Sequence, residues 1–122
     1  MAKNETVSFN ETPIVKKLND FIEHKDYLEA SLSLRTLSDS LQIQPHHLSV
    51  VIKRYHNNSF NDFINSYRIA HATTLLASNK HNNLSIEGVG ISSGFNSRAT
   101  FYRAFKRIKG MTPKEYQKSL RD

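Results

Sequence analysis

One pattern of apolar, small and basic residues occurs twice in this chain, and this internal repeat limits the possible folds more than any other feature. A shift of 52 positions places Leu37, Ser38 and Ile43 on Val89, Gly90 and Phe95. A shift of 53 positions places Leu48, Ile52, Lys53, Arg54, Asn57, Ser59 and Phe63 on Phe101, Phe105, Lys106, Arg107, Gly110, Thr112 and Tyr116. Since 122 residues suffice for one compact domain or two very small ones, the repeat predicts two small related units.

The local patterns predict helices and no strand. Polar and apolar residues do not alternate over any useful run, and hairpin dipeptides such as Asn-Gly are absent. Helix starts are marked by Thr12 before Pro13, by Pro45, by Ser33, Ser59, Ser85 and Ser97, and by a capping box from Thr112 to Glu115. Asn57, Gly94 and Gly110 mark helix ends. We expect an all-α fold of seven helices, over about residues 12–25, 33–41, 45–56, 59–78, 85–91, 97–109 and 113–120, with a polar loop over 78–83.

Apolar residues at helical spacing predict the buried face of each helix. The residues expected to face inward in the repeated part are Leu37, Leu48, Val51, Ile52, Tyr55, Val89, Ile91, Phe101, Ala104, Phe105, Ile108, Tyr116 and Leu120. Ser38 and Gly90 are small residues at matching positions of the two short helices, where close packing excludes a larger side chain. Gly88 and Gly90 together cost the helix at 85–91 about 1–2 kcal/mol of helix propensity.

Each copy combines a short helix, a turn and a longer amphipathic helix, which is the arrangement of a helix-turn-helix motif. The second helix of such a motif enters the major groove of DNA, and its outward residues near the helix start reach base edges. The outward residues expected to contact DNA are His46, Ser49, Val50 and Lys53 in the first copy, and Arg98, Ala99, Thr100, Arg103 and Arg107 in the second. Arginine bonds guanine bidentately and a threonine methyl contacts thymine, so the second copy is expected to read DNA more by charge than the first.

The charge distribution supports a partner rich in phosphate. Residues 1–30 carry four bases and six acids, whereas residues 31–122 carry thirteen bases and five acids. The segment 98–109 contains five bases and no acid, which is typical of a phosphate-binding surface. Phosphate contacts are expected from His47, Arg54, Asn96, Ser97 and Lys106.

The absence of cysteine excludes several classes of protein. A chain with no cysteine has no disulfide framework, thiolate nucleophile, zinc ribbon or iron–sulfur cluster, and this composition favours an intracellular setting. No apolar run approaches the roughly 18 residues that a membrane-spanning helix needs. The six histidines include no pair with recognisable metal-ligand spacing, so no metal and no cofactor are expected.

Residues 31–120 resemble the DNA-binding domain of the AraC/XylS family of transcription regulators. The resemblance is carried by LSDSLQIQPHHLSVVIK (37–53), NSYRIAHATTLL (65–76) and, most specifically, IEGVGISSGFNSRATFYRAFKRIKGMTPKEY (86–116). In the last run a Gly-Phe turn, a Phe-Lys pair and Gly-x-Thr-Pro-x-x-Tyr follow in the family's order. The resemblance implies seven helices, with two helix-turn-helix subdomains at about 33–56 and 85–109 joined by a long central helix at about 59–78.

The resemblance also implies how such a domain works. Two recognition helices enter successive major grooves on one face of double-stranded DNA, and RNA polymerase is expected as a second partner. Residues 1–30 are interpreted as a tail and a first helix, which would form the linker from a sensor region, and residues 31–122 as the DNA-binding domain. We expect a monomeric domain of a cytoplasmic, nucleoid-associated regulator, whose parent protein is expected to dimerise through another region.

Parts of the same sequence also fit other functions. The basic helix at 98–109 is also compatible with an interaction module or a membrane-surface module that binds anionic lipid. A second, weakly charged copy about 53 residues away contributes nothing to lipid binding, so the repeat favours DNA. The aromatic residues lie at core spacing instead of forming a base-stacking platform. No nucleophile–base pair or phosphate-cradling glycine loop is evident, so an enzyme is not expected.

Overall fold

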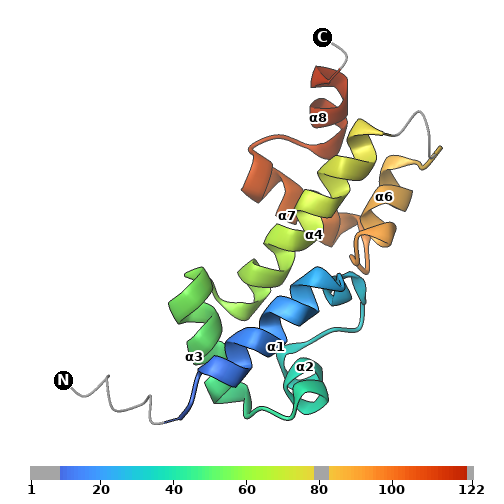
Figure 1. Ribbon diagram of the computed structural model, residues 1–122. Coiled ribbons are helices and arrows are strands. Elements are labelled where there is room, and N and C mark those ends of the chain that lie inside the picture. Colours follow the sequence, from blue (N-terminus) through green and yellow to red (C-terminus); the bar gives the residue numbers. More distant parts are fainter. Residues whose placement is uncertain (1–8, 79–82, 121–122) are drawn as a thin grey trace. The chain divides into compact units, whose positions relative to one another are not determined.

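A computed structural model of the protein describes residues 9–78 and 83–120. The expected tail before residue 9, the middle of the polar loop and the last two residues of the expected domain lie outside these ranges. Over the described residues the chain forms seven α-helices, one short 3₁₀ turn and no strand, which confirms the all-α prediction (Figure 1). The elements are α1 (Thr12–Glu23), η2 (Asp26–Leu28), α2 (Leu34–Leu41), α3 (Pro45–His56), α4 (Phe60–Ala77), α6 (Ile86–Ser92), α7 (Arg98–Lys109) and α8 (Pro113–Ser119).

The helix boundaries follow from the capping residues identified in the sequence. The side-chain oxygens of Ser33, Ser85, Ser97 and Thr112 each accept a backbone N–H three residues further on, and Ser59 does the same at the start of α4. Asn57 and Gly110 end α3 and α7 in the left-handed conformation, with φ of 55° and 79°. Because these signals are local, the sequence was sufficient to place most boundaries within two residues.

The start of α1 differs from the prediction. Thr12 is the first helical residue and Glu11 is the N-cap, so Pro13 occupies the second position of the helix. Asn10 explains the difference, since its side-chain oxygen accepts the Thr12 N–H at 3.1 Å and takes the place of the expected threonine cap. The helix also ends two residues early, at Glu23, because Lys25 adopts a φ of 59°.

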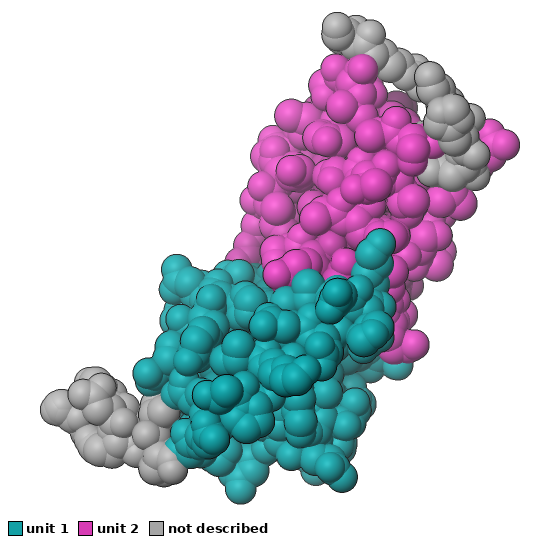
Figure 2. Space-filling view, in the orientation of Figure 1, with its two compact units in different colours: residues 1–26, 31–63 teal, residues 27–30, 64–122 magenta. Residues whose placement is uncertain are grey.

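The chain divides into two compact units (Figure 2). Unit 1 comprises residues 1–26 and 31–63, and therefore contains α1, α2, α3 and the first turn of α4. Its buried core residues are Ile14, Leu18, Phe21, Leu37, Leu48, Val51, Ile52 and Phe63. Helix α1 contributes to this core and packs against α3. Lys17 Nζ donates a hydrogen bond to the Leu41 carbonyl at the end of α2, at 2.7 Å.

Unit 2 comprises residues 27–30 and 64–122, so it holds most of α4 together with α6, α7 and α8. Its core is formed by Ile69, Ala72, Leu76, Val89, Phe95, Phe101, Ala104 and Phe105. The prediction of a small residue at position 90 is explained here, because a Cβ on Gly90 would lie 2.6 Å from the Phe101 ring. Glycine has a low helix propensity, but at position 90 it allows the short helix α6 to pack closely against α7.

Four residues expected to face inward are largely exposed. Tyr55, Ile91, Ile108 and Leu120 have exposed fractions of 52%, 67%, 43% and 48%. Each lies in the last turn of its helix or directly after it, where fewer neighbours surround a side chain. Tyr55, Ile108 and Leu120 lie on the expected side of their helices, so helical spacing does not indicate how far along a helix the packing extends. Ile91 lies on the opposite side of α6 from buried Val89, so its inward assignment was wrong.

Candidate nucleic-acid interface

Helix α3 exposes the polar surface expected of the first recognition helix. Leu48, Val51 and Ile52 are fully buried on one side. On the other side His46 and Lys53 are exposed, whereas Ser49 and Val50 are partly buried. No acidic residue occurs in α3, and Lys53, Arg54 and His56 lie in its last turn. The predicted contact residues of the first copy thus share one face.

The two residues of α3 that were expected to contact phosphate already contact other residues of the chain. The His47 ring stacks on Phe9, with centroids 3.8 Å apart and planes inclined by 11°. The Arg54 guanidinium lies 3.6 Å from the carboxylate of Glu11. Sequence reasoning did not anticipate either contact, because both partners belong to the segment before α1.

Helix α7 exposes the second predicted surface. Arg98, Ala99, Thr100, Arg103, Lys106 and Arg107 are all exposed, and no acidic residue occurs in the helix. Ser97 accepts the Thr100 N–H at 3.2 Å, and the Thr100 hydroxyl donates to the Ser97 carbonyl at 3.0 Å. The threonine hydroxyl is thereby held against the backbone of the first turn, which leaves its methyl group to contact a partner.

Arg98 lies on the flank of this surface. Its guanidinium carbon sits 4.5 Å from the centroid of the Tyr102 ring, and its Nη2 donates to the Tyr102 hydroxyl at 3.4 Å. Glu87 of α6 is 3.9 Å from its Nε, and both side chains are more than 60% exposed. The hydrogen bond to Tyr102, helped by Glu87, raises the pKa of Arg98, so the group stays charged. These exposed contacts are weak and leave Arg98 available to an anion.

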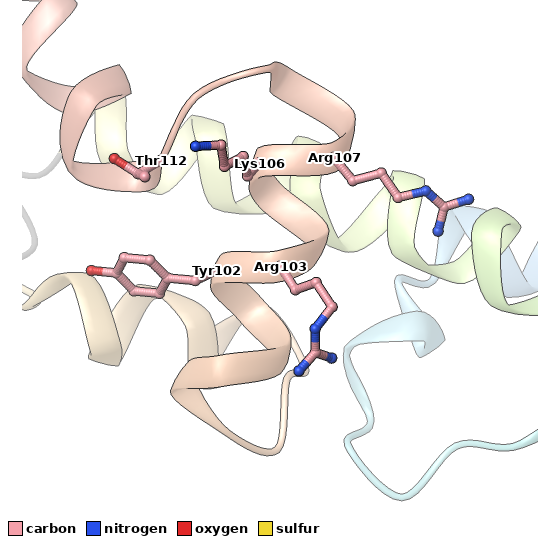
Figure 3. A pocket seen from close by; sticks show the side chains of 5 residues that line it. All are labelled: Tyr102, Arg103, Lys106, Arg107 and Thr112. Atoms are coloured by element: carbon pink, nitrogen blue, oxygen red, sulfur yellow. The ribbon is translucent and has the colours of Figure 1, made fainter.

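A basic groove runs between α7 and the start of α8. It is lined by Tyr102, Arg103, Lys106, Arg107 and Thr112 (Figure 3). Figure 3 shows Tyr102, Lys106 and Thr112 on one side of the helix, with Arg103 and Arg107 extending from the other. Its lining residues include three cations and no carboxylate, and these cations extend on both sides of α7. Both sides of the helix are therefore attractive to anionic oxygens.

The turn that precedes α7 is held by a buried arginine that sequence reasoning missed. Arg68 of α4 donates from Nε to the Tyr27 carbonyl at 2.7 Å and from Nη2 to the Glu29 carbonyl at 2.8 Å. Its guanidinium carbon also lies 5.8 Å from the centroid of the Phe95 ring. A Cβ on Gly94, whose φ is 99°, would come within 2.7 Å of the Arg68 Nε. The turn residues Gly94 and Phe95 are therefore fitted around this side chain.

A second contact ties the same turn to the segment 27–30. Asn96, predicted to contact phosphate, donates from its side-chain amide to the Ala30 carbonyl at 3.3 Å.

Burial lowers the pKa of Arg68, an effect that the nearby Glu29 opposes. The sequence does contain a signal for this site, because Arg68 interrupts the buried stripe formed by Ile64 and Ala72 of α4.

Residues 9–78 and 83–120 contain no group of three or more histidine or acidic side chains that could hold a metal ion. None of the helices formed by these residues is long and apolar enough to cross a membrane.

Comparison with known proteins agrees with this geometry. Residues 37–119 match the family model described as a helix-turn-helix domain. An uncharacterized HTH-type transcriptional regulator of Staphylococcus aureus is 34% identical over 106 residues, which is 84% of this chain and 13% of that protein. The regulator YtdP of Bacillus subtilis, also uncharacterized, is 27% identical over 108 residues, 87% of this chain and 14% of its own length.

Solved structures share the fold. The C-terminal domain of AraT, a response regulator from Geobacillus stearothermophilus, superposes with a TM-score of 0.79 at 28% identity, covering 88% of this chain and 85% of that one. The DNA-binding domain of AdpA, solved with a target DNA, gives a TM-score of 0.76 at 19% identity over 89% and 93% of the two chains. The chain spans about one seventh of the curated relatives it matches. It belongs to the AraC/XylS family of transcription regulators, and its residues 37–119 are the helix-turn-helix domain of that family.

Proposed function

We propose that α3 and α7 are the two recognition helices and that each places its exposed face in a major groove of duplex DNA. The observation that carries this proposal is the exposed face of α7, a helix without an acidic residue, on which Arg103, Lys106 and Arg107 are all exposed. The AdpA domain, which has the same fold, was solved with a target DNA, and we infer that this chain uses duplex DNA in the same way.

The residues of α7 divide into two roles in this proposal. Arg103, Ala99 and Thr100 face base edges, since they lie in the first half of the helix, where side chains reach the groove floor. Arg98 adds a guanine contact after leaving Tyr102. Lys106 and Arg107, in the last turn of the helix, contact phosphates together with Ser97 and Asn96 at its start.

Helix α3 recognises bases with fewer charged side chains than α7 does. His46 and Ser49 donate or accept hydrogen bonds at base edges, Val50 contacts apolar edges such as a thymine methyl, and Lys53 supplies the one cation of the reading face. His47 and Arg54 lie on the flank of α3 and face the phosphate backbone. The two helices therefore select different base sequences.

The wider setting is also a proposal. The domain, which comprises residues 31–122 and also uses α1 and residues 27–30, acts as a monomer on one site, and its parent regulator dimerises through another region. RNA polymerase is a second partner, and the protein acts in the cytoplasm beside the nucleoid. Its role is binding without catalysis. Membership of a DNA-binding family favours this interpretation over a membrane-surface module.

The test begins with selection of binding sites from random duplexes by the purified chain. Arg103→Ala is expected to cost about 1–3 kcal/mol on the selected site and to relax base preference in one segment of it. Arg107→Ala is expected to weaken binding to selected and random duplexes about equally. Lys16→Ala on α1, whose side chain is 78% exposed, removes the same charge elsewhere and serves as the control. Equal losses on selected and random duplexes for both α7 variants would contradict the assigned roles.

A further inference from the structure

The segment directly before α1 lies on the recognition helix of unit 1. Phe9, Asn10 and Glu11 form this segment, which we call the strap. The Phe9 ring covers His47 at 3.8 Å, and the Glu11 carboxylate lies 3.6 Å from the Arg54 Nε. His47 and Arg54 are seven residues apart in one helix and therefore lie on the same side of α3, next to Val50 of the reading face.

The strap is held by more than one interaction. Only 13% of the Glu11 side chain is exposed, although Arg54 is 52% exposed. The Tyr55 hydroxyl also bonds the Glu11 carboxylate, which raises the pKa of that tyrosine. Asn10 accepts the Thr12 N–H, and the Glu11 carbonyl accepts the Val15 N–H at 3.0 Å, so the strap continues directly into α1. One carboxylate thus faces both Arg54 and Tyr55 of the same helix.

A DNA phosphate would bind the same hydrogen-bond donors that the Glu11 carboxylate contacts. Guanidinium and phenol donors bind phosphate oxygens as they bind a carboxylate, and a carboxylate left in place repels a phosphate. We propose that the strap competes with a backbone phosphate for the flank of α3 formed by His47 and Arg54, so that full docking of α3 on DNA requires Glu11 to leave. This inference rests on the proposed function of α3. It assigns to residues 9–11 a role in setting the affinity of the first helix-turn-helix motif.

The competition predicts an increase in affinity when the strap loses its charge. Glu11→Gln in the full chain is expected to tighten binding to a selected duplex about twofold to fivefold near 0.1 M salt. Because Arg54 then gains a phosphate contact, the plot of log affinity against log salt is expected to steepen by about 0.9. Glu23→Gln, at an exposed position of the same helix α1, changes the net charge equally and is the matched control. We expect it to leave the salt slope unchanged.

A double-mutant cycle separates competition from a general charge effect. Arg54→Ala is expected to cost little in the wild-type chain, where Glu11 holds the guanidinium, and several-fold more in the Glu11→Gln background. Phe9→Ala, which loosens the strap without changing its charge, is expected to tighten binding in the same direction. Thermal unfolding of every variant identifies any change that arises from loss of the fold.

The outcomes distinguish the two proposals. A wild-type chain that prefers no duplex over random DNA would overturn the proposed function itself. A wild-type chain that binds its site, while Glu11→Gln behaves like Glu23→Gln or binds more weakly with its fold intact, would overturn only the competition by the strap. Equal costs of Arg54→Ala in both backgrounds would do the same.

Discussion

At the scale of single residues, Gly90 shows a direct conflict between helix propensity and packing. An alanine there would gain about 1 kcal/mol of helix propensity. Its Cβ would also approach Cδ2 and Cγ of Phe101 to 2.6 and 2.7 Å, and Phe101 is only 1% exposed. We expect Gly90→Ala to lower the free energy of unfolding by about 1–3 kcal/mol, measured by urea denaturation.

Gly88, two residues earlier in α6, is the matched control. A Cβ at this position would meet its closest neighbour, the Ser85 Oγ, at 3.2 Å, and the Leu84 side chain at 3.4 Å. Gly88→Ala is therefore expected to leave stability unchanged or to raise it by up to about 1 kcal/mol. Similar losses for the two variants would show that packing against Phe101 is not what requires glycine at position 90.

His56 gives the stability of unit 1 a dependence on pH. Its ring lies 4.7 Å from that of Phe63, and burial lowers the pKa of His56 below its ordinary value of 6.5. The unfolded chain therefore binds a proton more readily than the folded one, and the free energy of unfolding falls as the pH drops below 6.5. We expect His56→Gln to reduce this fall between pH 7.5 and pH 5 in denaturation experiments. An identical pH profile in the variant would contradict the assignment.

At the scale of elements, the turn between α6 and α7 depends on a side chain from α4. Lysine in place of Arg68 keeps the charge but cannot reproduce the two fixed donors directed at the Tyr27 and Glu29 carbonyls. We expect Arg68→Lys to lower the free energy of unfolding by about 1–3 kcal/mol, because a buried carbonyl loses its partner. Arg35→Lys, at an exposed position of α2, is the control and is expected to have no measurable effect.

The distance along the chain between interacting residues explains which features the sequence could predict. The helices were predictable because their caps, such as Ser97 and Thr112, act within three residues along the chain. The candidate recognition faces were predictable because helical spacing separates buried from outward residues. The contacts of Arg68 with residues 27–30, and of Phe9 with His47, join distant segments and leave no periodic pattern.

At the scale of the whole molecule, the net charge of +6 arises from residues 31–122, which hold thirteen bases against five acids. If about six to eight of the thirteen bases in residues 31–122 meet phosphates, log affinity should fall with log salt at a slope of about −5 to −7. Fluorescence titrations of one labelled duplex at several salt concentrations measure this slope. A slope near zero would contradict an interface built on phosphate contacts.

The difference between α3 and α7 predicts an asymmetric binding site. Identical recognition helices in a two-fold dimer select a palindrome, but here two different helices belong to one chain. We expect footprinting at a 1:1 ratio to show two unlike segments, about 10 bp apart on one face of the duplex. Inserting about 5 bp between them should abolish the contribution of one segment. A palindromic footprint that needs two chains would contradict this prediction.

The chain order of the two units has a consequence for recombining them. Unit 2 uses residues 27–30, which stand between two stretches of unit 1, and Arg68 bonds two of their carbonyls. A fragment that starts at residue 64 would leave the Arg68 donors without these acceptors. The second motif and the residues that support it therefore do not form one continuous stretch of chain. A chimaera that exchanges one motif for that of a relative must therefore carry two separate pieces of chain. An exchange made at the single junction in α4 would combine Arg68 and the α6–α7 turn of one protein with the segment 27–30 of the other.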